Sequence, residues 1–139
     1  MLQGARHEHS EALAAASQQL GIGIEVIELR MGKQVNSELD CLVLPGGEST
    51  AMLKIEEENN LFENIKILID SGIPTLGTCA GLILLSTNNV LGKETLQSID
   101  CSIERNSYGR QNQSFEALVK FHDFTGVYCF IRAPKIINY

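Results

Sequence analysis

The sequence has no tryptophan, only three prolines and few positive charges. Its 11 lysines and arginines are outnumbered by 17 aspartates and glutamates, and the formal net charge of -6 argues against a general binder of nucleic acid or of anionic membranes. No apolar run approaches the roughly 20 residues that cross a bilayer, and the start lacks a signal peptide's apolar stretch. We therefore expect a cytoplasmic protein whose partner is a small molecule or another protein.

Cysteine pairs of the C-x-x-C type are also missing. The four cysteines, Cys41, Cys79, Cys101 and Cys129, lie far apart, and no histidines stand near them at the spacing of zinc ligands. We predict reduced thiols and no metal site. With 139 residues, 44% of them hydrophobic, the chain can bury one core, and it is too short for two ordinary domains. One domain over residues 1–139 is expected.

Helical and strand patterns alternate along the chain. Short apolar or alternating runs predict strands at 24–29, 40–45, 74–78, 96–104, 115–121 and 127–131. Helices are predicted at 10–20, after Ser49 or Thr50, from Asn60 and from Cys79. The alternation predicts an α/β fold built around a mainly parallel sheet, with no repeat or linker.

The helix that begins at Asn60 is the best defined of these. Asn60 and Glu63 have the spacing of a capping box, and an apolar face follows them. Gly72 can supply a left-handed C-terminal turn, and Pro74 prevents the helix from continuing. This helix is therefore expected to end just before the next strand.

Residues 77–81 read Gly-Thr-Cys-Ala-Gly, the cysteine counterpart of the G-x-S-x-G nucleophile elbow. The motif lies between a predicted strand and a predicted helix, where the turn is too tight for side chains at the glycines and holds the nucleophile in a strained conformation. Amides at the start of the helix can stabilise a thiolate or an oxyanion. Cys79 is therefore predicted to be a nucleophile.

An isolated G-x-C-x-G run is as often a buried structural cysteine between two packing glycines. Cys41 and Cys129 fit that interpretation better than Cys79 does, since both lie inside apolar runs with no turn to expose them. Cys101 lies within a predicted strand. We expect ordinary core or face positions for these three.

A second candidate segment, Pro-Gly-Gly-Glu-Ser-Thr at 45–50, follows another predicted parallel strand. Open α/β sheets bind ligands at the carboxyl ends of their strands, so this segment and the elbow should converge on one edge. Adjacent glycines let the backbone approach a substrate, and Glu48 and Ser49 offer an acceptor and a hydroxyl. Taken alone, the segment is better explained as a Pro-Gly-Gly turn followed by a Ser or Thr helix cap, which needs no ligand.

Together, these segments resemble the glutaminase subunit of pyridoxal 5′-phosphate synthase. The resemblance takes in Leu-Gln-Gly at 2–4, Glu-His at 8–9, the two segments above, Glu-Arg-Asn-Ser-Tyr-Gly-Arg-Gln at 104–111 and Phe-Ile-Arg-Ala-Pro at 130–134. It implies a flavodoxin-like class I glutamine amidotransferase fold with helices on both faces of a mainly parallel sheet. It also implies L-glutamine as substrate, the synthase subunit as partner and no cofactor.

By matching position, the resemblance makes Cys79 the nucleophile that forms a glutamyl thioester, which water hydrolyses to glutamate while ammonia is released. Backbone amides of Gly47 and Ala80 would hold the oxyanion. The glutamine site would be lined by Gly47, Glu48, Ser49, Arg105, Ile131 and Arg132. A guanidinium can hold an α-carboxylate in a two-bond fork, although most arginines simply face solvent.

This sequence departs from the family's pattern at both ends. The family has a buried strand before Leu-Gln-Gly and takes its catalytic base from a His-Pro-Glu segment, and neither is present here. His7, His9 and His122 match no such motif, so each is expected to be a polar surface or loop residue. We therefore expect an incomplete fold, truncated at both ends relative to a complete glutaminase domain.

Two functions remain open from the sequence. The first is a glutaminase that passes ammonia to the synthase subunit for vitamin B6 biosynthesis. The alternative is a catalytically inactive remnant or paralogue that only binds the synthase. A hydrolase or stress protein with a similar elbow is disfavoured, because those folds do not require the Arg105 and Arg132 motifs.

Overall fold

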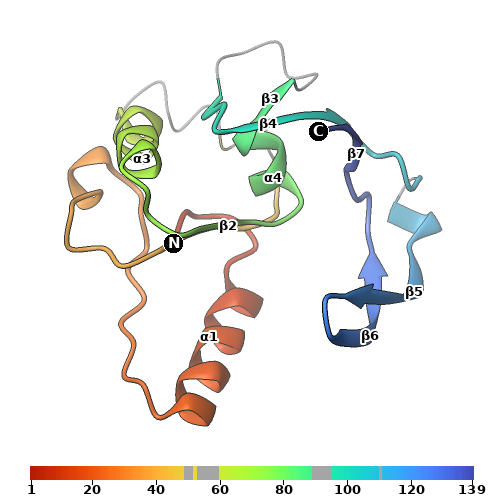
Figure 1. Ribbon diagram of the computed structural model, residues 1–139, viewed down its shortest axis with the longest axis horizontal. Coiled ribbons are helices and arrows are strands. Elements are labelled where there is room, and N and C mark those ends of the chain that lie inside the picture. Colours follow the sequence, from red (N-terminus) through yellow and green to blue (C-terminus); the bar gives the residue numbers. More distant parts are fainter. Residues whose placement is uncertain (49–51, 53–59, 89–94, 110) are drawn as a thin grey trace.

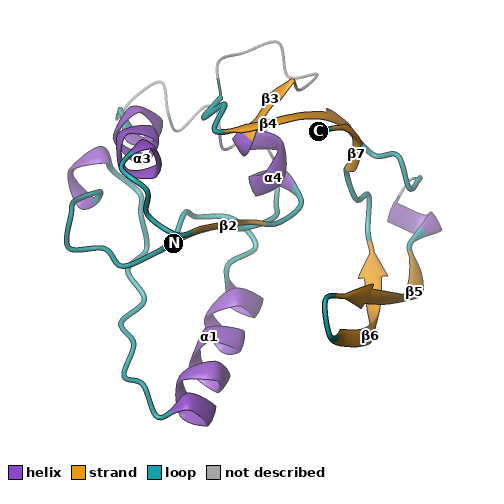
Figure 2. Ribbon diagram, viewed as in Figure 1, coloured by secondary structure: helices purple, strands orange, loops and turns teal. Residues whose placement is uncertain are grey.

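The computed structural model describes residues 1–48, 52, 60–88, 95–109 and 111–139. Helices and short strands alternate through these ranges, which makes the chain an α/β protein (Figures 1 and 2). Helix α1 and the strands β5 and β6 project from the body of the molecule toward the same side of the view. No helix within the described ranges has the length and apolar character that crossing a membrane requires.

Helix α1 (His7–Leu20) confirms the helix predicted at 10–20 and begins earlier than expected. Gly21 ends it in the left-handed conformation, with φ of 65°, which glycine adopts without strain. None of the residues of α1 is buried. The helix is therefore attached to the rest of the molecule by contacts of residues near its N-terminal end, and not by a buried apolar face.

The strand predicted at 24–29 is wrong for most of its length. Within the described residues, this stretch contributes one parallel bridge, between Leu29 and Leu2, and its apolar side chains Ile24, Val26 and Ile27 are exposed. A β-branched composition favours a strand, but a strand also needs a paired neighbour. A short 3₁₀ helix, η1 (Gly32–Gln34), follows.

The core forms around strands β1 (Leu42–Leu44) and β2 (Thr75–Gly77), which pair in parallel as expected for their predicted runs. All three residues of β1 are buried, in keeping with a run that is apolar throughout. The Leu2 amide donates to the Val43 carbonyl over 2.9 Å and so extends the hydrogen bonding beyond β1. The main core cluster contains Leu2, Leu29, Leu42, Leu44, Met52, Leu61, Phe62, Ile65, Ala80, Leu84, Leu85 and Leu96.

Helix α3 (Leu61–Asp70) confirms the helix predicted from Asn60, but its start is capped differently. Asn60 adopts a left-handed conformation with φ of 50° and makes no side-chain cap hydrogen bond, so the predicted capping box is wrong. Gly72 is left-handed, with φ of 97°, as predicted. The helix predicted after Ser49 lies outside the described residues, apart from Met52, which is buried.

Helix α4 (Ala80–Leu85) follows β2 directly and packs its first turn on β1. A Cβ atom at Gly81 would overlap the carbonyl group of Leu44, because the two backbones touch there. Only glycine allows this approach. The contact determines where the turn between β2 and α4 lies.

The remaining described strands form a three-stranded and a two-stranded sheet. Strand β3 (Ser86–Asn88) pairs in parallel with β4 (Ile99–Glu104), and β7 (Lys135–Asn138) pairs with β4 in the opposite direction. Strands β5 (Phe115–Phe121) and β6 (Phe124–Phe130) form an antiparallel hairpin. The runs predicted at 96–104, 115–121 and 127–131 are thus strands, whereas β3, β7 and the 3₁₀ helix η2 (Gln111–Gln113) were not predicted.

The contact between Gly81 and Leu44 gives a first prediction. Gly81→Ala should lower the free energy of unfolding by about 1–3 kcal/mol or more, because a methyl group would force α4 away from β1. Gly23→Ala is the matched control, since nothing lies within 4 Å of a Cβ atom there. Urea unfolding followed by circular dichroism measures both, and equal midpoints would contradict the packing described.

A second prediction concerns the buried face of α3. Ile65 is fully buried, and truncating it to alanine should cost about 2–5 kcal/mol through lost burial and the cavity left behind. Ile67 lies on the same helix but is 63% exposed, so Ile67→Ala should change stability by no more than about 0.5 kcal/mol. Urea midpoints of the two variants should therefore differ widely, and a similar loss in both would contradict the orientation of α3.

Candidate active site

Cys79 occupies a strained turn between β2 and α4. Its φ of 48° and ψ of −106° are unusual for a residue other than glycine, and such a conformation costs on the order of 1–3 kcal/mol. The glycine two positions before it is closely packed as well, because a Cβ atom at Gly77 would lie 2.6 Å from the Leu85 side chain and 3.0 Å from the Gly81 carbonyl group. Cys79 is exposed to solvent. The predicted geometry of an elbow between a strand and a helix is therefore present.

Backbone hydrogen bonds hold this elbow on both sides. The Thr78 amide donates to the Leu44 carbonyl over 3.0 Å, which anchors the turn to the end of β1. The Gly81 amide donates to the Thr78 carbonyl over 2.8 Å and closes the turn. The Ala80 amide belongs to the first residue of α4, where a helix has no preceding turn to accept it. This amide therefore has no acceptor within α4.

The loop after β1 faces the elbow, as predicted from the common direction of β1 and β2. A Cβ atom at Gly46 would lie 3.3 Å from the Cys79 Cβ and 4.0 Å from its sulfur, so the loop backbone directly faces the thiol. The Ala5 amide donates to the Gly46 carbonyl over 2.8 Å. This bond orients the peptide that carries the Gly47 amide. Gly47 has a φ of 142°, a conformation that favours glycine.

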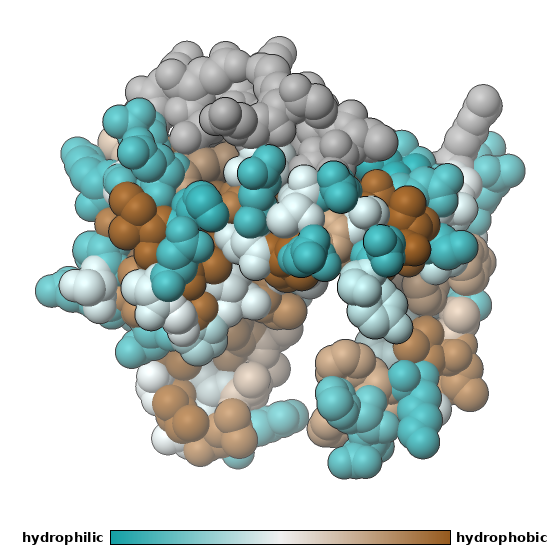
Figure 3. Space-filling view, turned by 45° about the horizontal axis from the view of Figure 1, so that its top comes forward, coloured by the Kyte–Doolittle hydropathy of each residue, from teal (hydrophilic) through white to brown (hydrophobic). Residues whose placement is uncertain are grey.

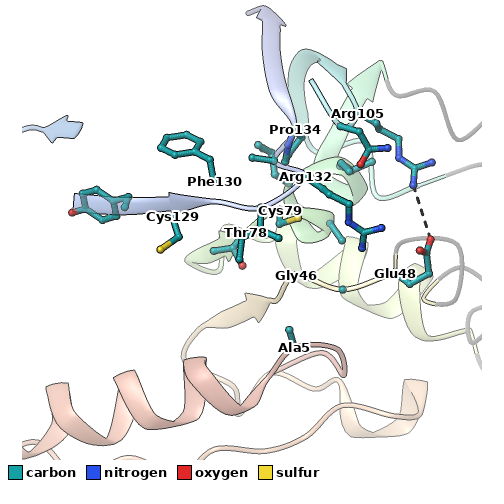
Figure 4. Close-up of a pocket in the computed structure, with 18 of the residues that line it drawn as sticks. Ala5, Gly46, Glu48, Thr78, Cys79, Arg105, Cys129, Phe130, Arg132 and Pro134 are labelled. Carbon is teal, nitrogen blue, oxygen red and sulfur yellow. Dashed lines mark ion pairs between the residues drawn. The ribbon is translucent and has the colours of Figure 1, made fainter. Parts of the chain in front are cut away.

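Cys79 lines a pocket of about 900 Å³. The space-filling view shows that the surface is hollowed between two projecting parts of the molecule (Figure 3). The walls of the pocket come from the loop after β1, the elbow, the end of β4 and the hairpin strand β6 with the residues that follow it (Figure 4). Ser49 lies outside the described residues. The other site residues predicted from the sequence all line this pocket: Gly47, Glu48, Cys79, Ala80, Arg105, Ile131 and Arg132.

Three charged side chains face the pocket. Arg105 approaches the Glu48 carboxylate to 4.0 Å, and the guanidinium-bearing side chain is only 29% exposed. Arg132 has a left-handed backbone, with φ of 46°, and its side chain extends between Cys79 and Glu48 in the close-up (Figure 4). Both arginines thus reach the same cavity from different segments. A site with two cations and one anion suits a ligand that carries both a carboxylate and an ammonium group.

An aromatic cluster connects the segments that carry the two arginines. Tyr108 follows Arg105 in the loop after β4, and its ring centroid lies 5.2 Å from that of Phe130, which precedes Arg132. Phe130 also stacks on Phe115 at 5.0 Å with an interplanar angle of 4°. Such ring pairs contribute roughly 0.5–1.5 kcal/mol beyond the burial of their area. The cluster therefore limits how far the two guanidinium groups can move apart.

Several pocket residues were not predicted. Gly46, next to the predicted Gly47, is the glycine in closest contact with Cys79, and the adjacent glycines at 46 and 47 were a signal for either position. Ala5 and Thr78 contribute from the N-terminal segment and from the elbow itself. The hairpin supplies Val119, Phe121, Tyr128, Cys129 and Phe130. Their alternation predicted a strand, but nothing in the sequence showed that the hairpin would form a wall of this pocket.

The other cysteines are only partly as expected. Cys101 is buried, and desolvation, together with the nearby Asp100 charge, raises the pKa of its thiol. Cys41 and Cys129 are exposed, so the prediction that apolar runs bury them is wrong. The hydrogen bond from the Cys129 thiol to the Glu116 carboxylate raises the pKa of that thiol, which disfavours its thiolate.

The three histidines occupy different surroundings. His7 is exposed on α1 and lies 3.3 Å from Glu11, and His122 is exposed in the turn between β5 and β6. His9 is half-buried, and its Nε2 lies 2.9 Å from the Thr78 hydroxyl. The expectation of a simple surface residue is therefore wrong for His9. Within the described ranges, no hydrogen bond joins a histidine to the Cys79 thiol.

Comparison with known proteins gives consistent matches along the whole chain. A family model described as the SNO glutamine amidotransferase family matches residues 1–139. The pyridoxal 5′-phosphate synthase subunit PdxT of Thermococcus onnurineus is 47% identical, over 99% of this chain and 72% of that protein. PdxT of Pyrococcus abyssi is 43% identical over the same shares of each chain. PdxT of Methanosarcina acetivorans is 40% identical, again over 99% and 72%.

A structural match agrees with these sequence matches. A solved structure described as the crystal structure of glutamine amidotransferase is 33% identical and superposes with a TM-score of 0.81. The superposition covers 98% of this chain and 70% of the other. The family model over residues 1–139 and the PdxT relatives together show that the chain belongs to the SNO glutamine amidotransferase family.

Proposed function

We propose that this chain is the glutaminase subunit of pyridoxal 5′-phosphate synthase and hydrolyses L-glutamine to L-glutamate and ammonia. The observation that carries the proposal is the exposed, strained Cys79 facing the Gly46–Gly47 backbone across a pocket that also holds two arginines. Family membership and the PdxT relatives support the same activity.

In the proposed reaction, the Cys79 thiolate attacks the side-chain amide carbon of glutamine. The tetrahedral oxyanion accepts hydrogen bonds from the backbone amides of Gly47 and Ala80, which lie on the two segments facing one another across the thiol. Collapse of this intermediate breaks the carbon–nitrogen bond and releases ammonia, with the proton that the nitrogen gains coming from the group that deprotonated the thiol. Water then hydrolyses the thioester to glutamate. None of the chain's histidines is assigned as this base.

The charged residues are proposed to hold the amino-acid end of the substrate. Arg105 and Arg132 can fork the α-carboxylate, and the Glu48 carboxylate can accept from the α-ammonium group. Ser49 and Ile131 are proposed to complete the binding site, with Ile131 as an apolar wall. A substrate held in this way points its side-chain amide toward Cys79.

We propose one glutamine amidotransferase domain over residues 1–139, with the flavodoxin-like arrangement of a mainly parallel sheet between helices. The parallel pairs β1–β2 and β3–β4 and the structural match support that arrangement. The partner is proposed to be the synthase subunit, which would receive the ammonia. Four unpaired cysteines support a reducing compartment such as the cytoplasm.

The nucleophile gives the third prediction. Cys79→Ala should abolish glutamate release from L-glutamine by the chain assayed together with the synthase subunit, because no thioester can form. Cys41→Ala is the matched control, since Cys41 is also exposed but does not line the pocket, and it should retain activity. Glutamate is measured with a coupled dehydrogenase assay. Equal activity in Cys79→Ala and the unaltered chain would disprove the assignment of the nucleophile.

Covalent labelling separates a glutaminase from a chain that only binds the synthase. The glutamine-like electrophile 6-diazo-5-oxo-L-norleucine should attach to Cys79, and peptide mass spectrometry identifies the site. Co-purification with the synthase subunit is measured on the same sample. Binding to the synthase without labelling of Cys79 would favour the binding-only alternative and contradict the proposed reaction.

The fourth prediction concerns substrate binding. Arg132→Gln should raise KM for glutamine about 10- to 100-fold, because a hydrogen bond to a charged group contributes roughly 1.5–3 kcal/mol. Lys120→Gln removes an exposed cation of the hairpin that does not line the pocket, so it should leave KM unchanged. Steady-state kinetics of the two variants provide the comparison, and equal KM values would contradict a substrate contact by Arg132.

A further inference from the structure

His9 lies next to the nucleophile elbow although 69 positions separate it from its partner. It stands in the first turn of α1, is half-buried, and brings its Nε2 within 2.9 Å of the Thr78 hydroxyl. Either partner can donate in this hydrogen bond, depending on the imidazole tautomer. A histidine that served only to solvate the helix surface would not need a partner in another segment.

Thr78 directly precedes Cys79, and its backbone is already constrained on both sides. Its amide donates to the Leu44 carbonyl, and its own carbonyl accepts from the Gly81 amide. The hydroxyl is therefore the one remaining polar group of Thr78, and His9 holds it. With all three groups bonded, Thr78 cannot rotate without breaking a hydrogen bond. The strained conformation of Cys79 depends on this neighbour staying in place.

The same N-terminal segment also contacts the other half of the site. The Ala5 amide donates to the Gly46 carbonyl over 2.8 Å, in the loop that faces the thiol. Arg6 forms an ion pair with Glu28 at 2.7 Å, which ties the segment to the body just before α1 begins. Because α1 has no buried residues, these polar contacts and the His9 contact are what position it. The segment at 5–9 thus contacts both the loop after β1, through Ala5, and the elbow, through His9.

We infer that His9 is a positioning residue of the glutaminase centre. Its imidazole holds the Thr78 hydroxyl and thereby keeps the elbow in the conformation that aims the Cys79 thiol and the Ala80 amide at one point. His9 does not touch the reacting atoms and takes no proton in this role. The expected effect of His9 on turnover rests on the proposed function. Its expected effect on the conformation of the elbow rests on geometry alone.

Two measurements test the inference, on the full chain mixed with the synthase subunit. The first is the rate of Cys79 alkylation by iodoacetamide, followed by peptide mass spectrometry with exposed Cys41 as internal reference. The second is steady-state turnover of glutamine. His9→Ala should lower both the alkylation rate and kcat about two- to tenfold, as expected for one lost hydrogen bond, while KM stays unchanged.

Matched variants separate positioning from a general loss of structure. Gln presents an amide nitrogen at about the reach of Nε2 and should restore the rates, whereas the shorter Asn should not. Thr78→Val should match His9→Ala, whereas Thr78→Ser keeps the hydroxyl and should therefore be faster than Thr78→Val in both measurements. The double variant His9→Ala with Thr78→Val should be no slower than either single variant, because both remove the same bond. His7→Ala, on the exposed side of α1, should change nothing.

The outcomes are distinguishable from failure of the proposed function. If even the unaltered chain releases no glutamate, the alkylation rates still report whether His9 holds the elbow. Unchanged alkylation and kcat in His9→Ala would overturn the inference. So would additive losses in the double variant, since they would show that the two side chains act separately.

Discussion

The backbones of α4 and β1 touch at Gly81 and Leu44, and the candidate site depends on this contact. A side chain at position 81 would separate the helix from the strand, and the turn that carries Cys79 would then lose its anchor on the Leu44 carbonyl. Gly77 fulfils the same requirement on the strand side, against Leu85. The two glycines of the G-x-C-x-G run are therefore needed for packing, and the packing is what forces Cys79 into a strained, exposed position.

The second requirement is that the loop after β1 lies opposite the elbow. Strands β1 and β2 are parallel neighbours in register, so the segments that leave their carboxyl ends begin side by side. The N-terminal segment then orients the loop through the bond from Ala5 to Gly46 and contacts the elbow through His9. Three stretches distant in the sequence thus contribute to one site, and each is held by backbone groups or by a single side chain.

Sequence patterns predicted the parts of this site that depend on local constraints. The elbow, the buried run of β1 and the alternating run of β5 have local signals, because turn geometry, burial and strand period are properties of a few consecutive residues. Asn60 illustrates the limit, since capping-box spacing did not produce a capped helix start. Exposure of Cys129 and the contact of His9 with Thr78 depend on how distant segments pack. Such packing leaves no periodic trace in the sequence.

The net charge of the pocket lining is positive, whereas the net charge of the whole chain is negative. The protein carries a formal net charge of -6, yet the charged groups lining the pocket are Arg105, Arg132 and Glu48, a net positive set. The negative net charge repels anions, so phosphates and nucleic acids are disfavoured at the surface. Two guanidinium groups confined to a cavity would nevertheless bind a carboxylate more strongly than they would in bulk water. Glu48 adds an acceptor for an ammonium group. In the proposed site, this small mixed set of charges favours a free amino acid, which carries both charges on one carbon, over simple anions or cations, and the amino acid's side chain would reach the strained thiol.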